Sequence, residues 1–129
     1  MKGIVTNILK DTLENENFRK VLYTGQHCQL VVMNIQPGEN IGMEVHQTID
    51  QFIRVEKGTA KVVMDGDEME VADDFAFIIP AGTQHDVINL SQSEPLKLYT
   101  VYSPANHPAG TIHKDKAQAE AAETAKHGN

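Results

Sequence analysis

The stretch Pro80-Ala81-Gly82-Thr83-Gln84-His85, followed by Asn89, combines a tight corner with a histidine. A second histidine-bearing stretch, Glu44-Val45-His46, precedes it, with Gln51 and Gly58 further along the chain. Each stretch lies among short apolar and β-branched runs bounded by turn residues, a pattern typical of antiparallel strands. Two histidine-bearing segments in this setting predict one metal pocket built from two hairpins.

Length and composition indicate one globular domain. The chain has 129 residues, of which 40% are hydrophobic and 22% charged, enough to bury a core without disulfides. The formal charge of −7 argues against nucleic acid and membrane surfaces as partners, because both favour basic proteins. The single cysteine, Cys28, and the lack of a signal-peptide pattern or a long apolar run predict a cytoplasmic protein.

Short strands separated by turn signals predict a sandwich or barrel. In residues 51–56, alternation places Gln51, Ile53 and Val55 on one face. Asp65-Gly66 predicts a hairpin turn of type I′, which needs positive φ at both central residues. Further strands are expected at residues 30–35, 59–64, 68–71, 75–79, 85–89 and 96–102. Residues 11–20 could form a short helix or a loop, and the Ala-, Glu- and Lys-rich residues 115–125 predict a helix.

Four side chains are candidate metal ligands. Glu44 and His46 are two residues apart, so a strand would place them on the same face. Gln51 opens the next strand and is expected to point to the same interior, while His85 enters from the other hairpin. Two imidazoles and one carboxylate with open positions suit a non-haem iron site, and the same set suits Mn, Ni or Zn. The sequence therefore predicts one divalent metal ion without specifying which.

The chain resembles a small single-domain cupin of the RmlC-like group. The second cupin motif is matched at Pro80, Gly82, His85 and Asn89, with Asp74 where glycine is usual. The resemblance implies an all-β, antiparallel jelly-roll barrel, or double-stranded β-helix, with a short N-terminal segment and a helical tail. It implies a single domain over residues 1–129, in which residues 18–104 form the barrel, 105–114 a closing segment and 115–129 the tail. Residues 50–56 and 106–113 look like a subgroup loosely described as mannose-6-phosphate-isomerase-like.

The first cupin motif is altered here. By resemblance, Glu44 stands in the position of the first motif histidine and Gln51 in that of the motif glutamate. The usual three histidines and one carboxylate become two histidines, one carboxylate and one amide, so the ligand charge is unchanged. This favours a retained but altered metal site, although Gln is a weaker ligand than Glu. Glu44 could instead orient His46, Gln51 could bind a water, and His85 could cap its corner.

Several residues near the motifs have open roles. His107, His113 and Tyr102 are candidate catalytic residues. The two histidines flank a Pro-Ala-Gly turn and are expected in an exposed loop; alternatively, this segment folds back over the barrel mouth. Cys28 is expected to be a buried small hydrophobe. Arg54 is the basic residue near the motifs and is expected to point outwards, which disfavours a phosphorylated sugar as substrate.

Two main functions compete. The first is a metal-dependent enzyme that acts on a small polar metabolite, of isomerase, epimerase or dioxygenase type. The alternative is a non-catalytic barrel that binds a sugar or metabolite beside a weak or empty metal site; a storage or scaffold role is the third. Because small cupins resemble one another in pairing, and because outward residues such as Phe52 and Val63 need cover, a homodimer is expected.

Overall fold

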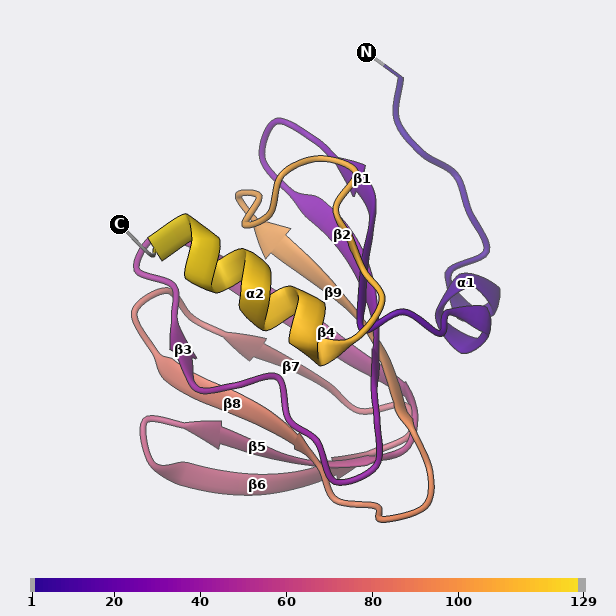
Figure 1. Cartoon of the computed structure of the whole chain (residues 1–129), viewed down its shortest axis with the longest axis vertical. Coiled ribbons are helices and arrows are strands. Elements are labelled where there is room, and N and C mark those ends of the chain that lie inside the picture. The colour runs from indigo at the N-terminus through magenta and orange to yellow at the C-terminus, as the bar shows by residue number, and fades with distance from the viewer. Residues whose placement is uncertain (1, 128–129) are drawn as a thin grey trace.

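The computed structural model describes residues 2–127 as two facing antiparallel sheets with two flanking helices (Figure 1). The elements are α1 (Ile8–Glu14), β1 (Arg19–Thr24), β2 (Gln29–Ile35), β3 (Glu44–Val45), β4 (Asp50–Lys57), β5 (Thr59–Met64), β6 (Asp67–Ala72), β7 (Ala76–Ile79), β8 (Gln84–Asn89), β9 (Leu96–Ser103), β10 (Ile112–His113) and α2 (Lys116–His127). The predicted all-β jelly-roll class with a helical tail is confirmed. Residues 128 and 129 of the predicted tail lie outside the described residues.

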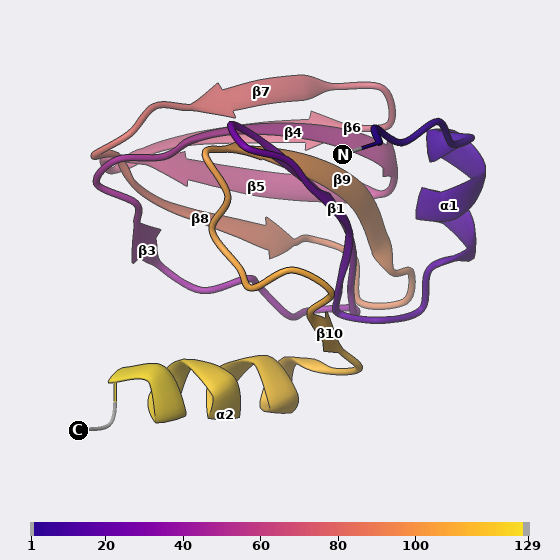
Figure 2. The ribbon, with the colours of Figure 1, turned by 90° about the horizontal axis from the view of Figure 1, so that it is seen from above.

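The connections between the sheets are those of a jelly roll. The larger sheet has the order β10-β1-β2-β9-β4-β7, and the smaller sheet has the order β3-β8-β5-β6. From β4 onward the chain crosses to β5 and β6, returns to β7, crosses to β8 and returns to β9, so the two sheets are wound together. Figure 2 shows the strands curving around one interior.

The core lies between the two sheets. On β4, Gln51, Ile53 and Val55 are 3%, 0% and 0% exposed, as the alternation predicts. The other buried apolar side chains of the core include Val31, Met33, Ile35, Val62, Val87 and Leu98. Full burial of each large apolar side chain stabilises the fold by roughly 1.5–3 kcal/mol. A one-residue slip would turn these faces outwards, so the core also sets the strand register.

Local turn chemistry agrees with the hairpin prediction. Asp65 and Gly66 have φ values of 47° and 88°, and they join β5 to β6. Residues 11–20 were expected to form a short helix or a loop, and residues 11–14 of this segment lie in α1. The N-cap residue of α1, Asn7, accepts a hydrogen bond from the backbone N–H of Lys10. The Lys97 ammonium on β9 donates to the carbonyl of Leu13 at 2.7 Å, which holds α1 against the outer face of the larger sheet.

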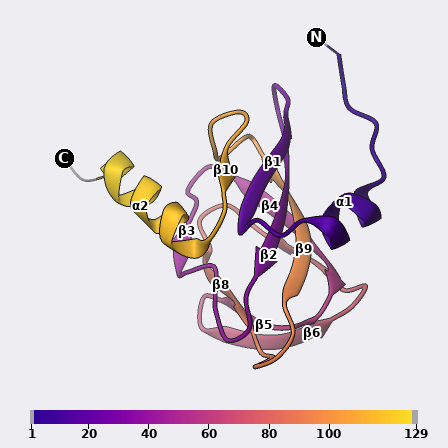
Figure 3. The ribbon, with the colours of Figure 1, turned by 45° about the vertical axis from the view of Figure 1, so that its right-hand side comes forward.

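The C-terminal helix α2 lies on the opposite side of the barrel from α1 (Figure 3). Lys116, Ala119, Glu120 and Glu123 are spaced three and four residues apart, so they share one face, and they line a cavity at the barrel mouth. Ala119 is 8% exposed and packs onto the core. Neither helix combines the length and the apolar composition that crossing a membrane requires.

Two burial expectations are wrong. Cys28 is exposed because the chain turns before β2: the N–H of Gly25 donates to the carbonyl of Cys28 at 2.8 Å, which places the thiol in the connecting loop. Val63 needs no further cover, because it is already only 9% exposed within the chain. Phe52 on the larger sheet does remain half-buried at the outer surface.

Candidate functional site

Strand pairing brings the two histidine-bearing segments together. β3 pairs with β8, and Glu44 lies directly opposite His85. Residues opposite each other in an antiparallel pair project from the same face. The glycine corner also contacts the first segment, because the N–H of Gly82 donates to the carbonyl of His46 at 2.8 Å. Gly82 has a φ of 85°, which a residue with a side chain would adopt only with strain.

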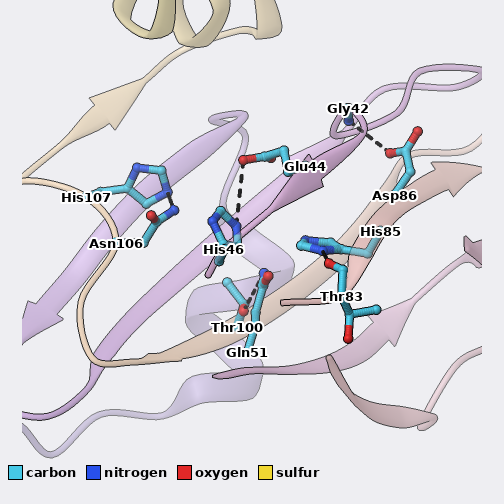
Figure 4. Close-up of polar contacts among 10 residues, drawn as sticks. All are labelled: Gly42, Glu44, His46, Gln51, Thr83, His85, Asp86, Thr100, Asn106 and His107. Atoms are coloured by element: carbon cyan, nitrogen blue, oxygen red, sulfur yellow. Dashed lines mark hydrogen bonds and ion pairs between the residues drawn. The ribbon is translucent and has the colours of Figure 1, made fainter. Parts of the chain in front are cut away.

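His46 and His85 face each other across the barrel mouth (Figure 4). Their ring centroids are 5.2 Å apart, with the planes inclined at 52°. The Nδ1 of His85 lies 2.9 Å from the carbonyl oxygen of Thr83. A carbonyl can only accept, so Nδ1 carries the proton and Nε2 of the neutral ring keeps its lone pair. A backbone carbonyl that orients an imidazole in this way is the usual arrangement behind a metal-binding histidine.

The amide of Gln51 presents its oxygen without a partner. The hydroxyl of Thr100 donates to the carbonyl of Phe52 at 2.8 Å, so its oxygen can only accept from the Gln51 Nε2, which lies 3.1 Å away. This contact orients the amide and leaves the buried Oε1 of Gln51 without a hydrogen bond. An unsatisfied buried acceptor is costly, so a water, a ligand or a cation at this oxygen would stabilise the site.

Glu44 lies at the edge of the histidine pair. Its Oε2 is 3.6 Å from Nε2 of His46, and its side chain is 32% exposed. Burial raises the pKa of the Glu44 carboxyl, whereas the positive charge of Arg19, and that of His85 when its ring is protonated, lower it. Two ligand atoms at about 2.1 Å from one ion lie about 3.0 to 3.4 Å apart. The observed separation is therefore close to the one that a shared ion requires.

The donor set fits a divalent ion. Figure 4 shows the amide of Gln51 beside the rings of His46 and His85, with the carboxylate of Glu44 next to them, and these are donors that Mn, Fe, Ni and Zn accept. Among the residues that the structure describes, no three His, Cys, Asp or Glu side chains already form a metal-binding cluster. The metal ion, and the roles of His46, His85, Glu44 and Gln51 as its ligands, therefore stay predictions.

A cavity of about 600 Å³ lies between the barrel mouth and α2. Its walls include Glu44 and His46 from the first motif segment, Arg19 from β1, His107 from the closing segment and Lys116 from α2. A cavity of this size suits a small metabolite. Because His46 lines the cavity, a molecule bound there would lie next to the histidine pair.

The closing segment folds back over the barrel mouth, so the expectation of an exposed loop is wrong for both histidines: His107 is half-buried and lines the cavity, and His113 is half-buried in β10. Gln29, fully buried on β2, holds this segment in place: its Oε1 accepts from the N–H groups of Asn106 and His107, and its Nε2 donates to the carbonyl of His107 at 2.7 Å. Sequence reasoning missed Gln29. Its position as the first, polar residue of an otherwise largely apolar strand is the signal that could have identified it.

Tyr102 lies behind the cavity wall, 3% exposed. Its ring packs edge-on against His46 and His107, with centroid distances of 6.0 and 5.3 Å. Burial raises the pKa of Tyr102 to about 12. The phenol therefore stays protonated at neutral pH and can donate a hydrogen bond but cannot act as a base.

Arg19 and Lys116 overturn the expectation that Arg54 is the basic residue near the site. Arg54 does point outwards, where it pairs with Glu56. Arg19 lines the cavity, and β1–β10 pairing places it opposite His113. The Nη1 atom of Arg19 lies 3.1 Å from Nδ1 of His113, a residue that does not line the cavity.

Comparison with known proteins agrees with this architecture. Residues 31–102 match the family described as "Cupin domain". The uncharacterized protein YrkC of Bacillus subtilis (strain 168) is 46% identical over 128 residues, which cover 95% of this chain and 68% of YrkC. The uncharacterized protein L612 of Acanthamoeba polyphaga mimivirus is 43% identical over 118 residues, covering 88% of this chain and 73% of L612.

A solved structure matches this chain over nearly its whole length. BH2720 from Bacillus halodurans has a TM-score of 0.91 and 47% identity, with 93% of this chain and 95% of that chain covered. KdgF from Halomonas sp. has a TM-score of 0.63 at 22% identity, covering 68% of this chain and 78% of that chain, and so shares the fold alone.

Proposed function

This chain belongs to the cupin domain family, and from that premise we propose that it is a metal-dependent enzyme that acts on a small polar metabolite, by isomerase, epimerase or dioxygenase chemistry. One observation carries the proposal: His46 and His85 face each other with the Gln51 amide, whose Oε1 has no hydrogen bond, beside them (Figure 4), and His46 lines a cavity of about 600 Å³. A buried acceptor next to two imidazoles is the arrangement that a divalent cation would complete.

Each residue then has a role. His46 and His85 hold the metal, Gln51 supplies a neutral oxygen, and Glu44 either completes the set or orients His46. A bound divalent ion polarises a substrate oxygen. His107 lines the cavity and is the candidate for moving a substrate proton, whereas Tyr102 is buried behind the cavity wall and does not line it. His113 is disfavoured as the proton carrier because it does not line the cavity.

The alternative is a barrel that binds a metabolite without catalysis. It is favoured by the neutral amide of Gln51, where the family pattern has a carboxylate, and by the lack of a ready-made cluster of three His, Cys, Asp or Glu ligands in the described part of the chain. In that case the cavity binds its ligand with a weak or empty metal site beside it.

Metal titration separates the two functions. Metal-free protein would be titrated with Mn²⁺, following free Mn²⁺ by electron paramagnetic resonance, and with Fe²⁺, Ni²⁺ and Zn²⁺ by calorimetry. We expect stoichiometric binding to the wild type, and binding at least about tenfold weaker for His46→Ala and His85→Ala. Gln51→Glu should tighten binding by about tenfold or more, because it adds a negative charge in contact with the cation.

His27→Ala is the matched control, since His27 lies in an exposed loop. Equal binding by the wild type and both histidine variants would place the metal elsewhere. No binding of any of these ions by the wild type would exclude the metalloenzyme and leave the ligand-binding barrel. Metal-dependent turnover of hydroxy- and keto-compounds by the loaded protein would then test the enzymatic part of the proposal.

A further inference from the structure

Arg19 is a buried cation in the wall of the cavity. It is 7% exposed, and its Nε is buried without a hydrogen-bond partner. No carboxylate lies within ion-pair distance of its guanidinium among the side chains that the structure describes; the ion pairs there involve His46, Arg54 and Lys61. A charge removed from water without a counterion destabilises a fold. An anion in the cavity would remove this penalty.

The neighbours that contact the guanidinium of Arg19 are uncharged, and Glu44, whose pKa the charge of Arg19 lowers, lies beyond ion-pair distance from it. Nη1 donates to Nδ1 of His113, which must be unprotonated to accept, and the phenol of Tyr102 is also neutral. The Phe18 ring lies 5.3 Å from the Cζ atom of Arg19 and covers one side of it. The guanidinium is therefore rigidly held, charged and short of an acceptor at Nε. These are the properties of an arginine that recognises a planar anion.

We propose that the cavity binds a small metabolite that carries a carboxylate, with Arg19 as the residue that recognises it. This inference rests on the proposed function only in that both place a metabolite in the same cavity, and it names the chemical class of that metabolite. A carboxylate is favoured over a phosphate because Glu44, Glu120 and Glu123 line the same cavity. These acids would repel a doubly charged group more strongly than a singly charged one.

The chain offers an internal control for the test, because it contains two arginines, Arg19 and Arg54. Each gives a side-chain Nε–Hε signal in ¹H–¹⁵N spectra, and Arg54 lies on the outer surface paired with Glu56 and Asp74. Pyruvate would be titrated into the wild type to about 50 mM, since one charged contact supports millimolar affinity. We expect a saturable shift of the Arg19 signal, none of the Arg54 signal, and no effect of methyl pyruvate, the uncharged ester.

Variants then assign the contact. Arg19→Met should weaken pyruvate binding at least tenfold, and Arg19→Lys should weaken it less, because it keeps the charge but loses the planar pair of donors. Arg54→Lys should leave binding unchanged. An Arg19 signal that pyruvate does not move would overturn the proposal. This measurement uses the wild type alone, so it does not depend on whether a variant folds. Tighter binding of inorganic phosphate than of pyruvate would replace the carboxylate by a phosphate as the recognised group.

Failure of the metal proposal is distinguishable from failure of this one. Pyruvate should still move the Arg19 signal in metal-free wild type and in His46→Ala, because the guanidinium is separate from the histidine pair. Binding of pyruvate without any binding of Mn²⁺, Fe²⁺, Ni²⁺ or Zn²⁺ would support the carboxylate site and exclude the metal site. Binding of Mn²⁺ with no effect of pyruvate on Arg19 would do the reverse.

Discussion

One hydrogen bond between two residues far apart in the chain determines the protonation of His113. The guanidinium of Arg19 has only N–H donors, so Nδ1 of His113 must accept and the ring must be neutral. Burial lowers the pKa of His113, and the positive charge of Arg19 lowers it further, while Glu123 raises it. Protonation would break the bond and place two cations side by side.

Stability should therefore depend on the pH through His113. In the unfolded chain the pKa is about 6.5, so below that pH the unfolded state binds more protons than the folded state. We expect the melting temperature of the wild type to fall as the pH decreases below about 6.5. His113→Gln can still accept from Arg19 and should show a flatter profile in the same range, measured by circular dichroism. His27→Gln is the control and should keep the pH profile of the wild type. If the melting temperature of the wild type depended on pH no more than that of His113→Gln, the prediction would be contradicted.

Among the elements, the β5–β6 hairpin and α2 depend on different kinds of information. Asp65-Gly66 has the turn stereochemistry that its two residue types favour, and no neighbour within 4 Å would meet a Cβ at Gly66. The helix α2 has a strong local propensity, but its position over the cavity depends on tertiary contacts: the burial of Ala119 and the hydrogen bond from the Lys116 ammonium to the side-chain oxygen of Asn40. The hairpin is thus specified locally and the docking of α2 by tertiary contacts.

Substitution at the hairpin tests the local part. Gly66→Ala should lower the free energy of unfolding by about 1 to 2 kcal/mol, because only the left-handed backbone conformation is penalised and there is no steric clash. Gly3→Ala, a glycine also in open space and without a positive φ, should have almost no effect. Urea denaturation measures both, and equal effects of the two substitutions would show that the φ of Gly66 is not the cause.

Substitution on α2 tests the docking. Ala119→Asp would place a charge in a buried position, so α2 should detach and its amide hydrogens should exchange faster, while those of β4 and β9 keep their protection. Ala122→Asp, on an exposed part of the same helix, is the matched control. Unchanged exchange in Ala119→Asp would mean that contacts other than Ala119 hold the helix over the cavity.

Across the whole molecule, one apolar row crosses the outer face of the larger sheet. Strand pairing places Ile78 opposite Phe52, Phe52 opposite Val101, Val101 opposite Leu30 and Leu30 opposite Tyr23. Ile78 is 61% exposed, and the others are half-buried. Contiguous apolar surface of this kind commonly marks an interface between protein chains.

We propose that two copies of the chain form a homodimer through this row. Sedimentation velocity at micromolar concentration should give the mass of a dimer, and Ile78→Glu should shift the chain towards the monomer by placing charges across the interface. Met69→Glu, at an exposed position of the smaller sheet, should leave the dimer intact. A monomer mass for the wild type would exclude the homodimer.

The sequence by itself determined most of the strands, the hairpin turn and the inward direction of Gln51, because alternation and turn stereochemistry depend on neighbouring residues; β10, where a loop was expected, was not among them. The motif positions also identified His46 and His85 as residues that meet. The tertiary structure decided what surrounds them: Gln29 holds His107 from 78 positions away, and Arg19 meets His113 across 94. Such contacts follow from strand pairing and from the placement of α2, which no local pattern specifies.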